Sequence, residues 1–283
     1  MKSVRRPASL VVLAVAWLVG SVSLPAVQEG AVVARPALTP AQMEDFLLNA
    51  RIIKKKAASK GVTDTQRATL SDGRITHDAQ IQTVDISKNV FEPTRELNFR
   101  DSYRYNIAGY RIAQLLGLDA VPMSVERRVE SKPAAVTWWI DDVLMDENER
   151  WKKRGTLATS TRAAEQIHIR HVFDALIENT DRNGGNLLWT TDGKMWMIDH
   201  TRAFRLDKEL KNPKVLERCE RGLLEAMRRL TAENLKREVG ASLTEREIEA
   251  LLARRDKIVQ LFDGMIAQRG ESAILYTSTG APR

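Results

Sequence analysis

Residues 172–205 read VFDALIENTDRNGGNLLWTTDGKMWMIDHTRAFR, and this stretch carries the polar residues that decide how we interpret the chain. An apolar helical pattern is followed by Asp181 and Asn186 in a turn that contains two glycines. A β-hairpin is predicted next, because Asp192-Gly193 separates two short runs of strand-forming residues. Asp199 follows the second run. Since Asn186 and Asp199 begin and end the same two-stranded unit, we expect them to lie close together across it.

The three polar side chains match what a metal-dependent phosphoryl transfer requires. Asn186 and Asp199 offer hard oxygen ligands, which suit Mg²⁺ bound together with phosphate and water. Asp181 is positioned before the hairpin, where it could orient or deprotonate an attacking hydroxyl. Two simpler interpretations also fit the residues: a polar turn between Asp181 and Asn186, and a helix N-cap at Asp199.

The order Asp181-Arg182-x-x-x-Asn186 followed by Ile198-Asp199 resembles the catalytic and metal loops of the phosphatidylinositol 3-/4-kinase-like branch of the protein-kinase fold. HipA-type kinases and the secretory-pathway Golgi casein kinases share related features. The resemblance implies a kinase-like fold that binds ATP and Mg²⁺ and transfers phosphate to a hydroxyl-bearing acceptor. It also implies that Asp181 is the catalytic residue and that Asn186 and Asp199 are the metal ligands.

The resemblance extends toward the N-terminus and covers roughly residues 55–210. Residues 108–118, AGYRIAQLLGL, with Val121-Pro122 after them, resemble the αC helix and the following strand of that group. Trp138, Trp139 and Ile140 then fall near the hinge that holds the adenine, which implies adenine contacts for Trp139 and Ile140. Tryptophans in such a stretch are also common in strands and cores.

Two positions depart from the family pattern. The family's strand before αC carries a Lys that grips the nucleotide phosphates, and αC carries a Glu that pairs with this Lys. In this sequence the matching residues are Gln82 and Asn106. A Gln–Asn pair can form a hydrogen bond between the lobes, but it brings no charge to the phosphates. The alternative to an active kinase is therefore a pseudokinase that serves as a binding or scaffold module.

The loop that covers the nucleotide in kinases is also reduced. Lys60-Gly61-Val62 contains one glycine in place of a Gly-x-Gly-x-x-Gly run. Lys60 and the neighbouring Lys54, Lys55 and Lys56 are candidates to supply the missing positive charge to the phosphates. The three consecutive lysines also fit a solvated helix face or a membrane-surface patch.

Hydrophobic patterns predict a strand-rich N-terminal half with one inserted helix, over about residues 102–116, and a helical C-terminal half. Everything after Pro213 is predicted to be helical. This pattern is a two-lobe α+β layout. The expected parts are a signal peptide (1–28), a linker (29–38), an N-lobe (39–140) and a helical C-lobe (141–283) with the catalytic and metal loops at 181–205.

Residues 1–28 have the composition of a secretory signal peptide. Basic residues precede the apolar run LVVLAVAWLV at 10–19, and small residues follow it. An uncleaved membrane anchor is the alternative, because residues 8–27 carry no charge and about 20 residues can span a bilayer. Both interpretations place the rest of the chain outside the cytosol, and membrane contact is expected only through this segment.

The distribution of charge gives no reason to expect a nucleic-acid partner. Of the net charge of +7 on 283 residues, residues 1–28 supply +3 and residues 51–76 supply +5, which leaves −1 for the remainder. The basic stretch 51–76 contains none of the aromatic residues on which bases stack. The single cysteine, Cys219, excludes an intrachain disulfide and a cysteine-based zinc site.

Overall fold

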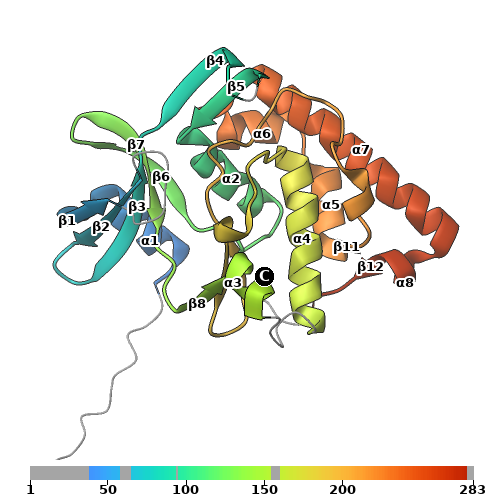
Figure 1. The fold of residues 1–283 in the computed structure, drawn as a ribbon, viewed down its shortest axis with the longest axis horizontal. Coiled ribbons are helices and arrows are strands. Elements are labelled where there is room, and N and C mark those ends of the chain that lie inside the picture. Colours follow the sequence, from blue (N-terminus) through green and yellow to red (C-terminus); the bar gives the residue numbers. More distant parts are fainter. Residues whose placement is uncertain (1–37, 58–64, 94, 154–159, 279–283) are drawn as a thin grey trace, which may run out of the picture. The chain divides into compact units, whose positions relative to one another are not determined.

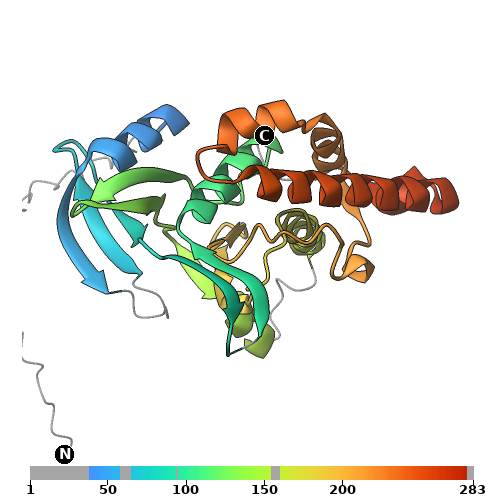
Figure 2. The same cartoon turned by 90° about the horizontal axis from the view of Figure 1, so that it is seen from above.

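The computed structural model describes residues 38–57, 65–93, 95–153 and 160–278. These residues form the ribbon of Figures 1 and 2, and Leu38–Arg283 makes up one compact unit. The predicted signal peptide, residues 29–37 of the linker and Lys60 lie outside the described residues. Within the described ranges, no helix combines the length and the apolar character that crossing a membrane requires.

A five-stranded antiparallel sheet forms the strand-rich part of the chain. Alternate buried residues of its central strands, such as Leu70 and Ile81, form its core face, and the buried Phe46 and Leu47 of the first helix join the same core. The sheet order is β1-β2-β3-β7-β6. The elements are α1 (Pro40–Asn49), β1 (Arg51–Ala57), β2 (Gln66–Ser71), β3 (Thr76–Gln82), β6 (Ser124–Val129) and β7 (Lys132–Trp138).

Lys54, Lys55 and Lys56 lie on β1, so the interpretation of this run as a helix face is wrong. The strand is at the edge of the sheet, with β2 as its neighbour. Lysines are common on edge strands, because their charge discourages pairing with a second molecule. Sequence patterns do not distinguish such a strand from a basic helix, since its charges hide the alternation of apolar residues.

Between β3 and β6 the chain makes a hairpin and then a helix. The hairpin consists of β4 (Asp85–Phe91) and β5 (Glu96–Ser102), and the helix α2 (Arg104–Leu115) follows it directly. This confirms the inserted helix expected near residues 102–116. Helix α2 contacts both the sheet and the C-terminal helices, so it joins the two parts of the fold (Figure 1).

A second, three-stranded sheet has the order β10-β9-β8. Its hairpin turns at Asp192-Gly193, as predicted, and Gly193 supplies the positive φ of 78° that this turn needs. The surrounding elements are β8 (Val143–Asp146), α3 (Glu147–Lys153), α4 (Thr161–Ile177), η2 (Gly184–Asn186), β9 (Leu187–Thr190) and β10 (Met195–Met197).

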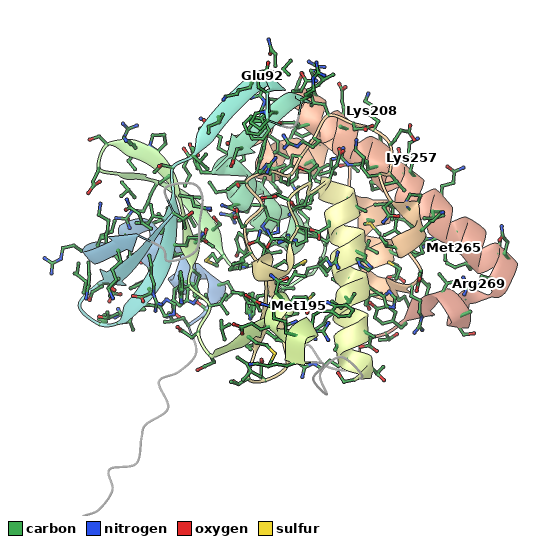
Figure 3. The ribbon with its side chains drawn as sticks, in the orientation of Figure 1. Glu92, Met195, Lys208, Lys257, Met265 and Arg269 are labelled. Atoms are coloured by element: carbon green, nitrogen blue, oxygen red, sulfur yellow. The ribbon has the colours of Figure 1, made fainter. Side chains whose placement is uncertain are left out.

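The C-terminal part is mainly helical. Charged side chains such as Lys257 and Arg269 line the outer side of α7 (Figure 3), whereas Ile258 and Phe262 of the same helix are buried. One continuous cluster of buried apolar residues runs from these helices into the sheet. The elements are η3 (Pro213–Val215), β11 (Cys219–Glu220), α5 (Arg221–Arg229), α6 (Ala232–Val239), α7 (Glu245–Arg269), α8 (Glu271–Ile274) and β12 (Leu275–Tyr276).

The prediction that everything after Pro213 is helical is wrong at two places. Strands β11 and β12 pair in parallel, with Cys219 opposite Leu275. Gly270 ends α7 with a φ of 83° and allows the chain to turn back toward β11. Two-residue strands that pair across more than 50 positions leave no local pattern in the sequence.

Candidate active site

Asp181 and Asn186 lie in the loop between α4 and β9. Helix α4 ends where Glu178 takes a left-handed conformation, with a φ of 48°, which redirects the chain into this loop. The Ile198 amide donates a hydrogen bond of 3.0 Å to the Asn186 carbonyl, across the mouth of the hairpin. Asn186 is therefore beside the Ile198-Asp199 segment, and the proximity expected from the hairpin is confirmed.

Arg182 holds this loop in place. Its buried guanidinium donates to both carboxylate oxygens of Asp174 at 3.1 Å, in the last turns of α4. The same group donates to the carbonyls of Asn186, at 3.2 Å, and of Ile198. One side chain thus joins the helix to both ends of the hairpin, and bidentate charged hydrogen bonds of this kind fix a geometry firmly.

Gly184 allows helix α3 to approach the loop. A Cβ atom at this position would overlap the side-chain oxygen of Asn148, at the start of α3. The helix itself is anchored by the buried Glu147, which accepts hydrogen bonds of 2.6 Å from the indole of Trp189 and the guanidinium of Arg150. Gly184 therefore serves the close packing of the loop against α3.

Asp199 has a φ of 56°, in the left-handed region that residues other than glycine rarely adopt. Strain of this kind persists where the surroundings over-determine the backbone, and it often accompanies functional sites. Here the Thr201 hydroxyl donates to Asp199 Oδ1 at 3.2 Å, and the next amide, that of His200, donates to Asn106 Oδ1 at 2.7 Å.

His200 packs beneath helix α2. Its ring meets Phe173 edge-on and touches the backbone at Gly109, where an added Cβ would lie 3.2 Å from the imidazole Cγ. Complete burial, with a smaller contribution from Arg182, holds the pKa of His200 well below its usual range. The imidazole is therefore neutral at pH 7 and acts as a packing group under the Asp199 segment.

Gln82 and Asn106 form a hydrogen bond between the sheet and α2. The Asn106 amide donates to Gln82 Oε1, and Gln82 Nε2 donates to the Thr65 hydroxyl at 3.3 Å. Because Asn106 Oδ1 also accepts from the His200 amide, a neutral chain of hydrogen bonds runs from the sheet to the Asp199 segment. Gln82 and Asn106 are 1% and 5% exposed, so this chain is buried.

Asp101 is a site residue that the sequence did not reveal. It is 7% exposed, and its Oδ1 atom has no hydrogen-bond partner among the described residues. Burial raises the pKa of Asp101; a hydrogen bond from Thr201 opposes this, and the nearby Asp199 and Asp181 carboxylates add to it. The Ser102 amide donates to the Thr201 carbonyl at 2.8 Å, which brings the end of β5 to the site.

Arg202 lies beside Asp181. The distance between Arg202 Nη1 and Asp181 Oδ1 is 3.4 Å, and the guanidinium is 5.0 Å from the ring centroid of Phe99. Phe99 is buried on β5 and stacks on Phe91 of β4. The hairpin β4–β5 therefore provides the surface on which Arg202 rests.

The two expected adenine contacts follow the last residue of β7. Trp139 carries the guanidinium of Arg67 over its ring at 4.2 Å, and Ile140 is buried. Trp138 instead stacks on His77 at 3.9 Å and meets Phe46 edge-on, so it belongs to the core of the sheet. The next residues pair with the hairpin: the Thr191 amide donates to the Asp142 carbonyl at 3.0 Å.

The donor set fits a magnesium ion held together with phosphate. Among the described residues, no group of three or more His, Cys, Asp or Glu is arranged to hold a metal by itself. Asn186 and Asp199 would supply two oxygen ligands, and the unpartnered Oδ1 of Asp101 adds a buried acceptor nearby. Mg²⁺ is usually bound in this way, through one or two carboxylates, substrate phosphates and water.

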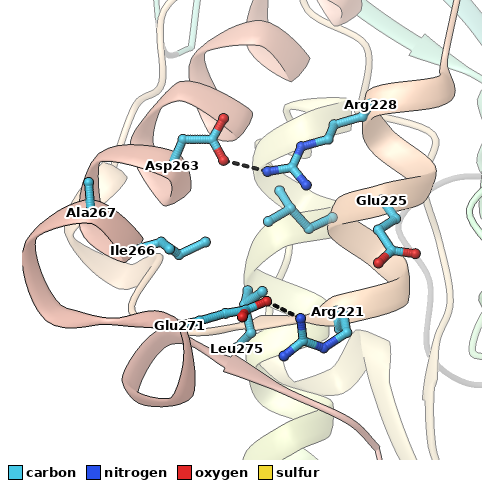
Figure 4. A pocket seen from close by; sticks show the side chains of 9 residues that line it. Arg221, Glu225, Arg228, Asp263, Ile266, Ala267, Glu271 and Leu275 are labelled. Atoms are coloured by element: carbon cyan, nitrogen blue, oxygen red, sulfur yellow. Dashed lines mark hydrogen bonds and ion pairs between the residues drawn. The ribbon is translucent and has the colours of Figure 1, made fainter.

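A cavity of about 290 Å³ lies elsewhere, between α5, α7 and α8 (Figure 4). Two arginines line it, but Arg221 is ion-paired with Glu271 and Arg228 with Asp263. None of the expected site residues contributes to its wall. With both arginines already paired, this cavity is a poor place for an anionic ligand.

No protein-family model and no curated protein matches the sequence. Among solved structures, the chain is similar to hydra Fam20, solved with sugar, with a TM-score of 0.60 and 13% identity over 85% of this chain and 93% of that one. A second match is the Helicobacter pylori proinflammatory kinase CtkA, with a TM-score of 0.44 and 11% identity over 75% and 92% of the two chains. The similarity to Fam20 shows that the chain has a kinase-like fold.

This confirms the two-lobe α+β kinase-like fold expected from the sequence. At such low identities the similarity concerns the fold alone and does not identify a branch of the kinases. Within this fold, Gln82 lies at the end of β3 and Asn106 lies on α2.

Proposed function

We propose that the protein binds Mg-ATP between its two lobes and transfers phosphate to a hydroxyl-bearing acceptor, with a site of the phosphatidylinositol 3-/4-kinase-like type. The observation that carries the proposal is the meeting of Asn186 and Ile198-Asp199 across the hairpin, with Asp181 at the start of the same loop. Arg182 supports the proposal because it ties both parts to α4.

In this proposal Asn186 and Asp199 hold Mg²⁺, which would neutralise charge on the phosphates during transfer. Asp181 accepts a hydrogen bond from the acceptor hydroxyl and directs its oxygen toward the phosphate. Trp139 and Ile140 contact the adenine. Gln82 and Asn106 lie on the phosphate side, where they keep the lobes joined, and the sequence adds Lys60 as a candidate phosphate contact.

We propose an exported location for the protein (periplasm, secretory pathway or extracellular space), with anchoring by residues 8–27 as the alternative. The proposal rests on the composition of residues 1–28. The acceptor is a lipid, a protein or a small molecule with a hydroxyl group, because a fold does not determine its substrate. Nucleic acid is not an expected partner.

A second candidate function is that of a pseudokinase that binds partners without transferring phosphate. The neutral, buried hydrogen bond between Gln82 and Asn106 favours it. This pair supplies no positive charge to a nucleotide. The side-chain amide of each residue also forms a further hydrogen bond within the protein.

The test uses the full-length chain, in two measurements. The first is thermal stabilisation by Mg-ATP, because a ligand that binds the native state raises its stability. The second is transfer of labelled phosphate to the protein itself and to lipid, peptide and sugar hydroxyls. The proposal predicts stabilisation, with transfer that is lost in Asp181→Asn. The matched control is Asp119→Asn, which changes an exposed aspartate paired with Lys194.

The outcomes separate the candidates. Stabilisation with transfer that depends on Asp181 supports the kinase. Stabilisation without transfer to any acceptor supports the pseudokinase. Absence of stabilisation in the wild-type chain would overturn the kinase and any pseudokinase that binds nucleotide.

A further inference from the structure

Among the described residues, the two positions where the family carries its Lys and Glu supply no positive charge. Gln82 and Asn106 are neutral and buried, while the oxygens of a transferring phosphoryl group carry negative charge that needs compensation. The metal compensates part of this charge. A cation from another part of the chain is required for the rest, and this inference rests on the proposed function.

Two basic residues near the site, Arg182 of the catalytic loop and Lys55 of β1, are engaged elsewhere. Arg182 is committed to Asp174 and to two carbonyl groups. Lys55 is ion-paired with Glu130, in the turn between β6 and β7. Neither side chain is available to a phosphate group beside Asp181.

Arg202 lies in contact with Asp181. Its guanidinium lies 3.4 Å from Asp181 Oδ1, and the two side chains are 25% and 48% exposed. Asp181 is the group expected to touch the acceptor hydroxyl, and that hydroxyl must approach the transferred phosphate closely. A guanidinium in contact with Asp181 is therefore within a side-chain rotation of the same phosphate.

The hairpin β4–β5 holds Arg202 at this position. The guanidinium lies over the ring of Phe99, and the ring face attracts a cation. Phe99 is fixed by its stacking on Phe91, with ring centroids 4.1 Å apart. Arg205 approaches the same ring at 5.4 Å, but it is buried and donates to the Arg100 carbonyl at 3.0 Å. Of the two arginines, Arg202 is the one that faces Asp181.

We propose that Arg202 is the phosphate-facing cation of this protein and replaces the lysine that the N-lobe lacks. Without nucleotide, Arg202 pairs with Asp181. When Mg-ATP binds, the guanidinium changes partner and donates two parallel hydrogen bonds to oxygens of the terminal phosphate. Asp181 is then released to accept the hydrogen bond of the acceptor hydroxyl. This exchange of partners moves no proton.

The experiment compares the dissociation constants of Mg-ATP and Mg-ADP, measured by calorimetry on the full-length chain. Arg202→Gln and Arg202→Met both remove the charge, and methionine keeps a flexible apolar side chain over the Phe99 ring. Loss of a charged hydrogen bond to the terminal phosphate predicts that Mg-ATP binding weakens about tenfold more than Mg-ADP binding. Arg202→Lys restores part of the difference. Lys208→Gln, an exposed lysine further along the same segment, leaves both constants unchanged.

Equal weakening of ATP and ADP binding in Arg202→Met, or no weakening at all, would overturn the assignment. Either result would mean that the Arg202 charge does not contact the terminal phosphate. If Arg202→Gln does not fold, Arg202→Met decides the question. The deciding quantity is again the weakening of Mg-ATP binding relative to that of Mg-ADP binding. Failure of the proposed function gives a different result: the wild-type chain itself then binds no Mg-ATP.

Discussion

The two sides of the candidate site differ in charge. On the side of the sheet, Gln82 and Asn106 are neutral, almost fully buried and bonded to each other. On the side of the β9–β10 hairpin, Asp181 and Asp199 lie near the buried Asp101, and Arg182 and Arg202 are close by. The charges that phosphoryl transfer needs are therefore gathered on the hairpin side.

The neutral side has a positioning role. Asn106 accepts the hydrogen bond of the His200 amide, directly after Asp199, while its own amide donates to Gln82. The pair thus connects the sheet to the segment that carries Asp199. A buried charge without a partner is strongly destabilising. Because both charged partners of the family pattern are replaced here, no such charge is left.

The largest expected difference between the two sides is in phosphate transfer. Asp181→Asn is expected to lower the transfer rate about a thousandfold, because it removes the group that orients or deprotonates the acceptor. Gln82→Leu, on the neutral side, is expected to lower it less than about tenfold, since it removes only a positioning hydrogen bond. Transfer of labelled phosphate at saturating Mg-ATP measures both. Equal losses in the two variants would contradict the division of roles.

A charge placed on the neutral side is expected to destabilise the fold. Gln82→Lys buries an ammonium group without an acidic partner, and we expect a loss of about 3 kcal/mol in the free energy of unfolding. The double variant Gln82→Lys with Asn106→Glu supplies the partner and should regain most of the loss. Urea unfolding of the three chains measures these values. A single variant as stable as the wild type would show that this part of the site is open to water.

Close packing under α2 connects the two sides, and Gly109→Ala tests it. The new Cβ would lie 3.2 Å from His200, so the ring must shift together with the Asp199 segment. We expect a loss of about 1–3 kcal/mol in stability and weaker Mg-ATP binding. The control is Gly264→Ala in α7, where nothing lies within 4 Å of the added atom and a gain of about 0.5–1 kcal/mol is expected. Unchanged ATP binding in Gly109→Ala would show that the packing of His200 does not affect the nucleotide site.

The smallest expected effect is a pH dependence from helix α4, which supports the hairpin side. Burial, with smaller contributions from Arg170 and His168, lowers the pKa of His171 to about 4. The unfolded chain therefore binds more protons at this residue between about pH 6.5 and pH 4, so stability falls as the pH decreases through this range. His171→Gln should flatten the decrease in urea midpoints over these pH values. An equal pH dependence of the urea midpoint in the wild type and in His171→Gln would contradict this prediction.

Local features of the site could be predicted from the sequence. The turn at Asp192-Gly193 sets the hairpin, and the hairpin brings Asn186 beside Asp199. The resemblance to the kinase family implied a hydrogen bond between Gln82 and Asn106, and the structure contains it. In the hairpin, a few neighbouring residues determine the backbone.

Contacts between distant segments could not be predicted. Asp101 reaches the site because Ser102 bonds to Thr201, about 100 residues further along the chain, and no local pattern signals this pairing. The approach of Arg202 to Asp181 depends on the ring of Phe99 in an inserted hairpin. Such contacts follow from tertiary packing and not from periodicity.

The most direct test of the central claim is the magnesium dependence of ATP binding in three full-length chains: wild type, Asp199→Asn and Gln82→Leu. Our account predicts that Mg²⁺ strengthens ATP binding in the wild type and in Gln82→Leu, and that Asp199→Asn loses this dependence because it lacks a metal ligand. Calorimetric titration with and without Mg²⁺ measures it. Magnesium-dependent binding retained in Asp199→Asn, or lost in Gln82→Leu, would contradict the account.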